Sequence, residues 1–485
     1  MINKVKEKWM NIPLTVKASA SYAICSILQN CLSFITLPLF TRLLTTEQYG
    51  QLTIYSSWSG ILSIFLTLNL AYGSFVTAMV KFDNNRHEYI SSVQGINIIL
   101  SVLFFLVYIP FYKIWNELFE LPTFLVVLMV FEILSQNAIQ LWIGKKRVEY
   151  NYKSVIIFTL LMSLLSPIVA YIMVVLSLEK GYARIFGYAF VTIVFGGIIF
   201  FINLKRGKHL FKKKFWKYAF KFNLPLLVYY LSQVIFNQSD RIMISHLSNK
   251  SHAAIYGVAY NLAMIMTFLL NAVNNSYVPW FYEKIKKDDT KENKNVSILI
   301  SIIMSLAILC IIWFAPEIIK IMAGKKYFEA VYVVAPVAMS LLLLFYSQLF
   351  INVEFYYEEK NLLVCSSIGS AVLNIVLNYL FIPMFGYVVA GYTTLISYIV
   401  FAISNYFAMQ NILRKRKLKD DLFNYYLLLV VLILFILSGL LGVFLYSYII
   451  LRILITCFVF VLLIIFRKKF IDELSMLSNK NSKEV

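Results

Sequence analysis

The chain has little charge for its length, and motifs that mark many soluble enzymes are missing. Of its 485 residues, 14% are charged and 5 are cysteine, whereas 60% are hydrophobic and 16% are aromatic. This balance is far from the average of soluble globular proteins. The sequence has no Gly-x-x-x-x-Gly-Lys-Ser/Thr loop, which excludes an ATPase of the P-loop type. It also has no Cys-x-x-Cys or His-Glu-x-x-His pair, so no metal or nucleophile site is indicated.

Long apolar runs recur along the chain at about the 20-residue length that a membrane-spanning helix needs. We therefore predict an all-α polytopic membrane protein with about 14 transmembrane helices. The predicted spans cover residues 14–44, 50–80, 90–112, 121–143, 154–178, 182–204, 218–247, 253–282, 296–322, 331–355, 361–383, 386–410, 422–446 and 447–466.

The net charge of +20 is distributed unevenly. Lysine and arginine concentrate in both termini and in every second loop, and such loops stay in the cytoplasm. Both termini are therefore predicted to be cytoplasmic. Clusters such as "FKKKFWK" are more typical of topology signals and of contact with anionic membrane lipids than of nucleic-acid binding.

The two groups of six spans resemble each other. "GYARIFGYAFVTIV" at 181–194 aligns with "GYVVAGYTTLISYIV" at 386–400 when one gap is allowed. Because each group has an even number of spans, the repeat is parallel, and a substrate site is expected between two pseudo-symmetric lobes. The predicted division is 1–204 for the first lobe, 205–217 for a basic cytoplasmic linker, 218–410 for the second lobe, 411–466 for two further helices and 467–485 for a cytoplasmic tail.

Several segments resemble a known family. They are "LPLFTRLLTTEQYGQLTIYSSW" at 37–58, "LPLLVYYLSQVIFNQSDRIMISHL" at 224–247, "AAIYGVAYNLAMI" at 253–265 and "NYLFIPMFGYVVAGYTTLISY" at 378–398. As a set they are similar to the polysaccharide-transporter branch of the multidrug, oligosaccharidyl-lipid and polysaccharide exporter superfamily, which includes O-antigen and capsule repeat-unit flippases. The segment "SNKSHAA" at 248–254 departs from the glycine-containing turn that is frequent in this branch.

The resemblance implies a flippase in the bacterial cytoplasmic membrane that works by alternating access without ATP or another cofactor. Its expected cargo is an undecaprenyl-pyrophosphate-linked oligosaccharide, moved from the inner to the outer leaflet for O-antigen or capsule biosynthesis. Polysaccharide polymerase and chain-length proteins are further expected partners, and a gradient of H⁺ or Na⁺ is a candidate driving force.

Side-chain amides recur in the predicted cytoplasmic halves of spans in both lobes. They are Asn69, Gln136, Asn137, Gln140, Asn271, Asn274, Asn275, Gln348 and Asn352. Because a buried hydroxyl left without a partner costs about 1 to 3 kcal/mol, a glycan carrier needs such polar groups. The alternative is that each amide joins neighbouring helices, a contact worth about 0.6 kcal/mol.

Three charged residues are candidates for an outer gate or a headgroup contact. At a rise of about 1.5 Å per residue from Lys221, Asp240 and Arg241 lie roughly 30 Å along their span, near the outer boundary. Arg42 is predicted at the outer end of the first span, and an arginine fork suits a phosphate. The alternative is an interfacial salt bridge that fixes helix ends.

Glu132 is predicted near the middle of its span with no lysine or arginine within a helical turn. A lone carboxylate there should be protonated or bound to a cation, which makes Glu132 a candidate for coupling to H⁺ or Na⁺. The alternative is a neutral Glu132 hydrogen-bonded to a neighbouring helix. Glu354 is expected to be more exposed, and Arg452 is expected to snorkel to the lipid headgroups.

Two other functions remain open from the sequence. A multidrug or small-molecule exporter of the same superfamily would share the fold, although the amides and arginines suit a polar anionic cargo better than a lipophilic cation. A membrane polysaccharide polymerase would need a substantial outer loop with catalytic residues, and the predicted outer loops are short.

Overall fold

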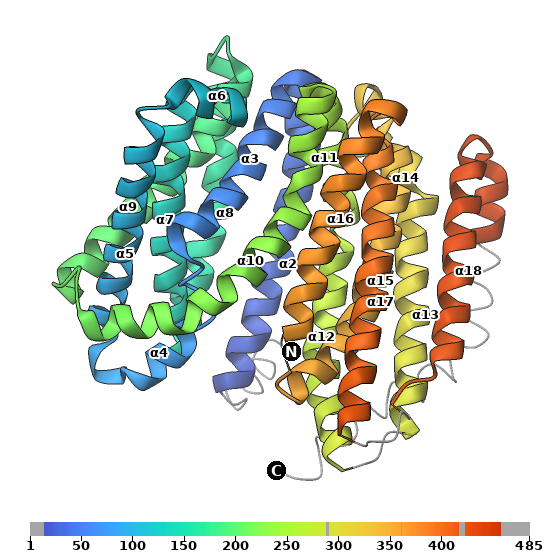
Figure 1. Cartoon of the computed structure of the whole chain (residues 1–485). Coiled ribbons are helices and arrows are strands. Elements are labelled where there is room, and N and C mark those ends of the chain that lie inside the picture. Colours follow the sequence, from blue (N-terminus) through green and yellow to red (C-terminus); the bar gives the residue numbers. More distant parts are fainter. Residues whose placement is uncertain (1–13, 288–290, 360, 417–421, 457–485) are drawn as a thin grey trace, which may run out of the picture. The chain divides into compact units, whose positions relative to one another are not determined.

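The computed structural model describes residues 14–287, 291–359, 361–416 and 422–456, and this part of the chain is helical with no β-strand (Figure 1). The α-helices are α2 (Leu14–Leu43), α3 (Thr46–Thr67), α4 (Phe75–Lys81), α5 (Arg86–Tyr108), α6 (Tyr112–Phe119), α7 (Thr123–Val148), α8 (Tyr152–Leu176), α9 (Lys180–Gly207), α10 (Lys213–Leu247), α11 (Lys250–Ala263), α12 (Met266–Lys286), α13 (Lys291–Trp313), α14 (Ala315–Met322), α15 (Ala330–Tyr356), α16 (Asn361–Phe385), α17 (Val389–Lys415) and α18 (Tyr425–Phe444). The predicted all-α class is confirmed.

Among the described residues, 12 helical segments are long and apolar enough to cross a membrane. The predicted polytopic membrane protein is therefore confirmed, while the count of fourteen and the orientation of the termini stay predictions. Helix α3 is not among the 12 because its sequence is rich in serine and threonine, but its 22 residues extend about 33 Å, enough to cross the hydrocarbon layer. The last predicted span, 447–466, continues past residue 456 and so lies partly outside the described residues.

The predicted single span at 50–80 is wrong. Helix α3 ends at Thr67, and α4 begins only at Phe75. Between them, Leu68, Asn69 and Gly73 have positive φ angles of 46°, 53° and 44°. A left-handed residue stops a right-handed helix, and periodicity in an apolar run does not reveal such a stop.

Contacts within the chain divide it into two units, Met1–Ala254 and Ile255–Val485. In the first unit, α7 packs along α9, and α10 packs along α3. The division of the sequence into lobes at 205–217 stays a prediction, and the structure has α10 beginning inside that segment, at Lys213.

Helix α10 changes direction along its length (Figure 1). Pro225 lies inside it, and proline removes a helical hydrogen bond and bends the chain. The segment before the bend inserts Phe215 and Ala219 into a buried cluster with Phe75 and Tyr89. The basic start of α10 is therefore anchored to the first unit by apolar contacts.

Polar side chains join α16 to α17 in the second unit. Asn374 donates to Thr394 at 3.3 Å, and Ser366 lies 3.1 Å from the amide oxygen of Asn405. Asn374 and Asn405 are both fully buried. These groups satisfy one another between two helices, the arrangement that polar residues commonly adopt inside membrane bundles.

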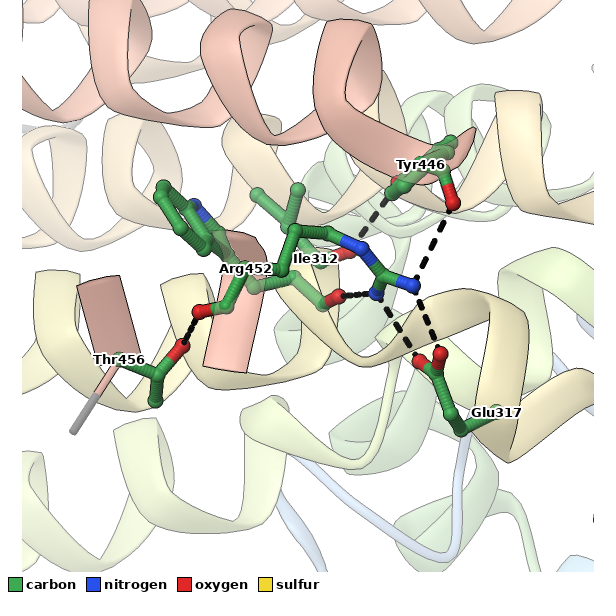
Figure 2. Close-up of polar contacts among 6 residues, drawn as sticks. Ile312, Glu317, Tyr446, Arg452 and Thr456 are labelled. Carbon is green, nitrogen blue, oxygen red and sulfur yellow. Dashed lines mark hydrogen bonds and ion pairs between the residues drawn. The ribbon is translucent and has the colours of Figure 1, made fainter. Parts of the chain in front are cut away.

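The expected snorkelling of Arg452 is wrong, because the side chain is only 2% exposed. Figure 2 shows its guanidinium fork directed at the carboxylate of Glu317, with N–O distances of 3.0 and 2.7 Å. The same fork donates to the carbonyl oxygens of Trp313 and Tyr446. A partner on α14, 135 residues earlier, therefore holds the arginine inside the protein instead of at the headgroups.

The Arg452–Glu317 pair predicts a pH-dependent contribution to stability. Burial alone would raise the pKa of Glu317, but the Arg452 guanidinium holds that pKa below its ordinary value. The stabilisation is therefore complete above the ordinary glutamate pKa of about 4.3 and is lost as the pH falls through the lower folded value. We expect Glu317→Gln to cost about 1 to 3 kcal/mol at pH 7, less than a fully buried pair because the Glu317 side chain is 33% exposed.

Thermal unfolding of wild type and Glu317→Gln between pH 7 and pH 3 measures this contribution. The difference in Tm should shrink as the pH falls. A difference that stays constant over this range would contradict a contribution from the ionised carboxylate.

A close contact between α7 and α9 gives a second stability prediction. A Cβ atom added to Gly196 would lie 2.5 Å from the carbonyl oxygen of Ser135, whereas one added to the adjacent Gly197 meets nothing within 4 Å. We expect Gly196→Ala to destabilise the protein by about 1 to 3 kcal/mol through overpacking. Gly197→Ala is the matched control, expected to be neutral or stabilising by up to about 1 kcal/mol because alanine favours helix. Thermal-shift measurements on both variants test this, and equal unfolding temperatures would contradict the close packing.

Candidate functional site

The first unit contains three adjoining polar cavities that share Gln140 as a lining residue. The central cavity, about 360 Å³, lies between α3 and α7. The side cavity, about 440 Å³, is lined by α2, α7, α8 and α9. The arginine cavity, about 710 Å³, lies at the end of α7 and includes Arg86 and Arg147 in its wall.

One face of α3 supplies hydroxyl groups to the central cavity. Its lining residues are Ser56, Ser59, Gly60, Ser63 and Thr67. Their spacing of three or four residues places them on a single helical face. The amides alone do not reveal this wall, but the serine and threonine periodicity along 56–67 could have identified it from the sequence.

The facing wall comes from α7. Glu132, Gln136 and Gln140 are each four residues apart and line the central cavity from one face of the helix. Gln136 also lines the side cavity. The predicted polar groups of this span are therefore brought together around hollow space.

Glu132 is not the lone carboxylate that the sequence suggested. The hydroxyl of Tyr55 on α3 donates to its Oε2 at 2.6 Å. Arg184 on α9 interacts with it electrostatically. The absence of basic residues near Glu132 in the sequence was misleading because both partners come from other helices.

Arg184 was missed by the sequence analysis. Its guanidinium carbon lies 3.3 Å from the ring centre of Tyr188 and 4.1 Å from that of Phe40. Tyr188 in turn lines the side cavity. These aromatic faces hold a positive charge beside the polar cavities.

Asn69 lies in the break between α3 and α4 and lines the central cavity together with Tyr72. Asn137 also lines this cavity, but it is buried and accepts a 2.6 Å hydrogen bond from Asn97 on α5. Both interpretations of the amides therefore apply in this unit: Asn69 and Gln140 line the cavity, and Asn137 lines it while also joining α5 to α7.

The candidate gate residues lie in different environments. Asp240 and Arg241 on α10 are buried, with exposures of 1% and 8%. Arg241 donates to Gln238 on the same helix at 2.7 Å, and Gln238 is the side chain nearest to Gly60 of α3. Arg42, on α2, is exposed.

The candidate amides of the second unit divide in the same way. Asn274 on α12 donates a hydrogen bond to Gln348 on α15. Asn352, one turn further along α15, is buried, whereas Asn271 and Asn275 on α12 are exposed.

Glu354 was expected to be exposed, and this is wrong. The residue is fully buried, and neither carboxylate oxygen has a hydrogen-bond partner within the described part of the chain. Its helix, α15, is almost wholly enclosed by neighbouring helices. The apolar sequence of α15 does not reveal this, because a lipid-facing span would have a similar composition.

Comparison with known proteins agrees with this architecture. The family described as "Polysaccharide biosynthesis protein" matches residues 15–285. The chain belongs to this family. A second family, described as MatE, matches residues 225–380. The predicted membership of the exporter superfamily, in its polysaccharide and lipid flippase branch, is confirmed.

Two proteins of Haemophilus influenzae are similar in sequence. An uncharacterized membrane protein is 22% identical over 386 residues, covering 74% of this chain and 88% of the relative. Lsg locus protein 1 is 26% identical over 164 residues, covering 32% of this chain and 39% of the relative. The chain thus spans less than half the length of the second relative.

Two solved structures share the fold. The lipid II flippase MurJ in an inward closed conformation superimposes with a TM-score of 0.65 at 16% identity, covering 91% of this chain and 99% of MurJ. An inward-facing multidrug resistance transporter of the MATE family gives 0.63 at 14% identity, covering 82% of this chain and 99% of that structure. Family and fold place the chain among multi-pass membrane proteins of polysaccharide biosynthesis.

Hydration of the central cavity can be tested with cysteine labelling. In a variant with all native cysteines replaced by serine, we expect Gln136→Cys to react with a charged, water-soluble thiol reagent at least about tenfold faster than Val102→Cys, because reaction requires the thiolate. Val102 on α5 is 52% exposed but lines none of the three cavities, so it is a matched control. Equally slow reaction at both positions would contradict a water-filled cavity.

Proposed function

We propose that the protein is a flippase that moves undecaprenyl-pyrophosphate-linked oligosaccharide repeat units from the inner to the outer leaflet of the bacterial cytoplasmic membrane. The product would be used for a surface polysaccharide such as O-antigen or capsule. The cycle would be alternating access, and polysaccharide polymerase and chain-length proteins would act on the cargo after transfer.

The observation that carries this proposal is the connected polar lining of the first unit. Serine and threonine hydroxyls of α3 and the carboxamides of Gln136 and Gln140 face the same hollow space. A sugar chain exchanges its water hydrogen bonds for such groups without leaving donors or acceptors unpaired. The family membership and the MurJ-like fold agree with this cargo.

Glu132 is the proposed site of coupling to H⁺ or Na⁺. Its carboxylate lies on the cavity wall, where an ion can reach it, and it is held by Tyr55 and influenced by Arg184. Binding a proton or cation would change the charge that Arg184 meets, which gives an ion gradient a means to bias the cycle. Asp240, Arg241 and Arg42 remain the proposed gate, and the candidate amides of the second unit, Asn271, Asn274, Asn275, Gln348 and Asn352, remain proposed cargo contacts.

A second candidate is export of small molecules, because the MatE family matches residues 225–380. The two functions differ in the cargo that the polar cavities must hold. A lipophilic cation would gain little from hydroxyl and amide walls and would be repelled by arginine. An efflux assay with cationic dyes separates this candidate from the flippase.

Deletion of the gene in its host tests the proposed function. The deletion strain should lose surface polysaccharide and accumulate lipid-linked repeat units on the cytoplasmic leaflet, and the wild-type gene should restore export. Glu132→Gln should restore little export because it cannot gain or lose charge, and Arg241→Ala should be similarly impaired if it gates the path. Surface polysaccharide and lipid-linked units are measured together.

Tyr55→Phe is the matched control for Glu132→Gln, because it removes the hydrogen bond to Glu132 and leaves the ionisable carboxylate. It should retain most of the export. Full export by Glu132→Gln would rule out an obligate coupling role, and normal surface polysaccharide in the deletion strain would refute the flippase in a host without a redundant carrier.

A further inference from the structure

The arginine cavity is the largest of the three polar cavities described above, at about 710 Å³. Its wall combines the break before α4, the first residue of α5 and the last turns of α7. The polar groups on the wall are Tyr72, Arg86, Gln140, Arg147 and Tyr150. No acidic residue is among its lining residues, so the wall is positively charged.

Glu149, two residues after Arg147 in the sequence, does not neutralise the positive charge of this wall. The carboxylate of Glu149 lies 3.1 Å from the ammonium of Lys145 and 3.3 Å from that of Lys146. The two lysines therefore occupy both carboxylate oxygens. Arg147, between Lys146 and Glu149 in sequence, contributes its charge to the cavity.

Both arginines are positioned by contacts that leave the fork of the guanidinium available. Arg86 donates from Nε to the carbonyl oxygen of Met79 at 2.8 Å, a bond that does not use its two terminal nitrogens. The guanidinium of Arg147 lies 5.2 Å from the ring centre of Tyr22 on α2. Two parallel N–H groups on a planar fork match the oxygens of a phosphate.

The rim of the cavity is apolar and open. Val76 and Val80 of α4 belong to the lining and are 59% and 65% exposed. Such exposed valines form an apolar surface that a hydrocarbon chain can cover. An anion that reaches this cavity with a hydrocarbon chain attached would keep that chain on the valines while its charged group meets the arginines.

The arginine cavity also adjoins the central cavity, where the sugar chain of the cargo is proposed to bind. Gln140 lines all three cavities, and Tyr72 lines both the arginine cavity and the central cavity. Along α7, Arg147 is 15 residues from Glu132, or about 22 Å. A group attached to an anion at Arg147 would thus extend along the polar face of α7 toward Gln136.

We propose that the arginine cavity is the docking site for the phosphate or pyrophosphate headgroup of a lipid-borne cargo, held by Arg86 and Arg147 at the end of α7 that is predicted to be cytoplasmic. This site would bind the cargo before translocation, and the inference rests on the proposed flippase function. It is distinct from the gate residues Arg42 and Arg241, which are predicted near the opposite boundary.

Binding to the full-length protein in lipid nanodiscs tests the proposal. The probes are undecaprenyl pyrophosphate, inorganic pyrophosphate and phosphatidylglycerol, and the variants are Arg86→Gln, Arg147→Gln and Arg147→Lys. We expect each glutamine variant to weaken binding of undecaprenyl pyrophosphate by about tenfold or more, the effect of losing one charge-assisted pair. Arg147→Lys should bind with intermediate affinity because it keeps the charge and loses the fork.

Arg206→Gln is the matched control, because Arg206 is an exposed arginine in the last turn of α9 and does not line the cavity. It should bind like wild type. Arg86→Gln also removes the bond to Met79, so Arg147→Gln carries the conclusion if Arg86→Gln fails to fold. Unfolding temperatures of all variants identify such a failure.

Three results would overturn the proposal. Unchanged affinity in folded Arg147→Gln would show that the lipid pyrophosphate binds elsewhere. Equally tight, arginine-dependent binding of inorganic pyrophosphate would assign the cavity to a free anion, and equally tight binding of phosphatidylglycerol would assign it to bulk lipid. Export in the deletion strain is scored separately. If the wild-type gene restores export but binding does not depend on Arg86 or Arg147, this site alone is refuted. If binding depends on the arginines but the wild-type gene does not restore export, the flippase function is refuted.

Discussion

Polar groups inside an apolar helical bundle must find a partner or water, because an unsatisfied group in hydrocarbon costs several kcal/mol. The protein meets this constraint in two ways. Asn374 and Asn405 of the second unit are fully buried against hydroxyl groups of a neighbouring helix. In the first unit, Gln136 and Gln140 face cavities instead. Side-chain amides therefore join helices in one place and line a cavity in another.

Arg452 and Glu132 meet the same constraint in two different ways. Arg452 is held by a carboxylate and two carbonyl oxygens that replace the water it has lost. Glu132 has a tyrosine hydroxyl and the charge of Arg184 but also lies on a cavity wall. The first arrangement is closed and suited to stability. The second is open to an ion or a cargo, which is what a coupling site requires.

Helix α7 carries the proposed coupling, sugar-binding and headgroup-binding residues along its length. Its exposed face carries Glu132, Gln136, Gln140 and Arg147 in order from the middle of the helix to its basic end. Gly196 of α9 packs closely against Ser135 of α7, so α9 supports this helix. A headgroup, a sugar chain and a coupling ion would therefore meet successive turns of one rigid element, so that binding at one end can influence the other without a long chain of intermediates.

Composition, apolar run length and the distribution of basic residues were sufficient to predict a helical membrane protein, and most predicted spans begin and end within a few residues of the observed helices, as 154–178 does against Tyr152–Leu176. These properties are local in sequence. The tertiary structure alone decided the break at Leu68, the burial of Glu354 and Arg452, and the partners of Glu132. The physical reason is that burial and pairing depend on which helices pack together, and residues such as Tyr55, Glu132 and Arg184 meet only after folding.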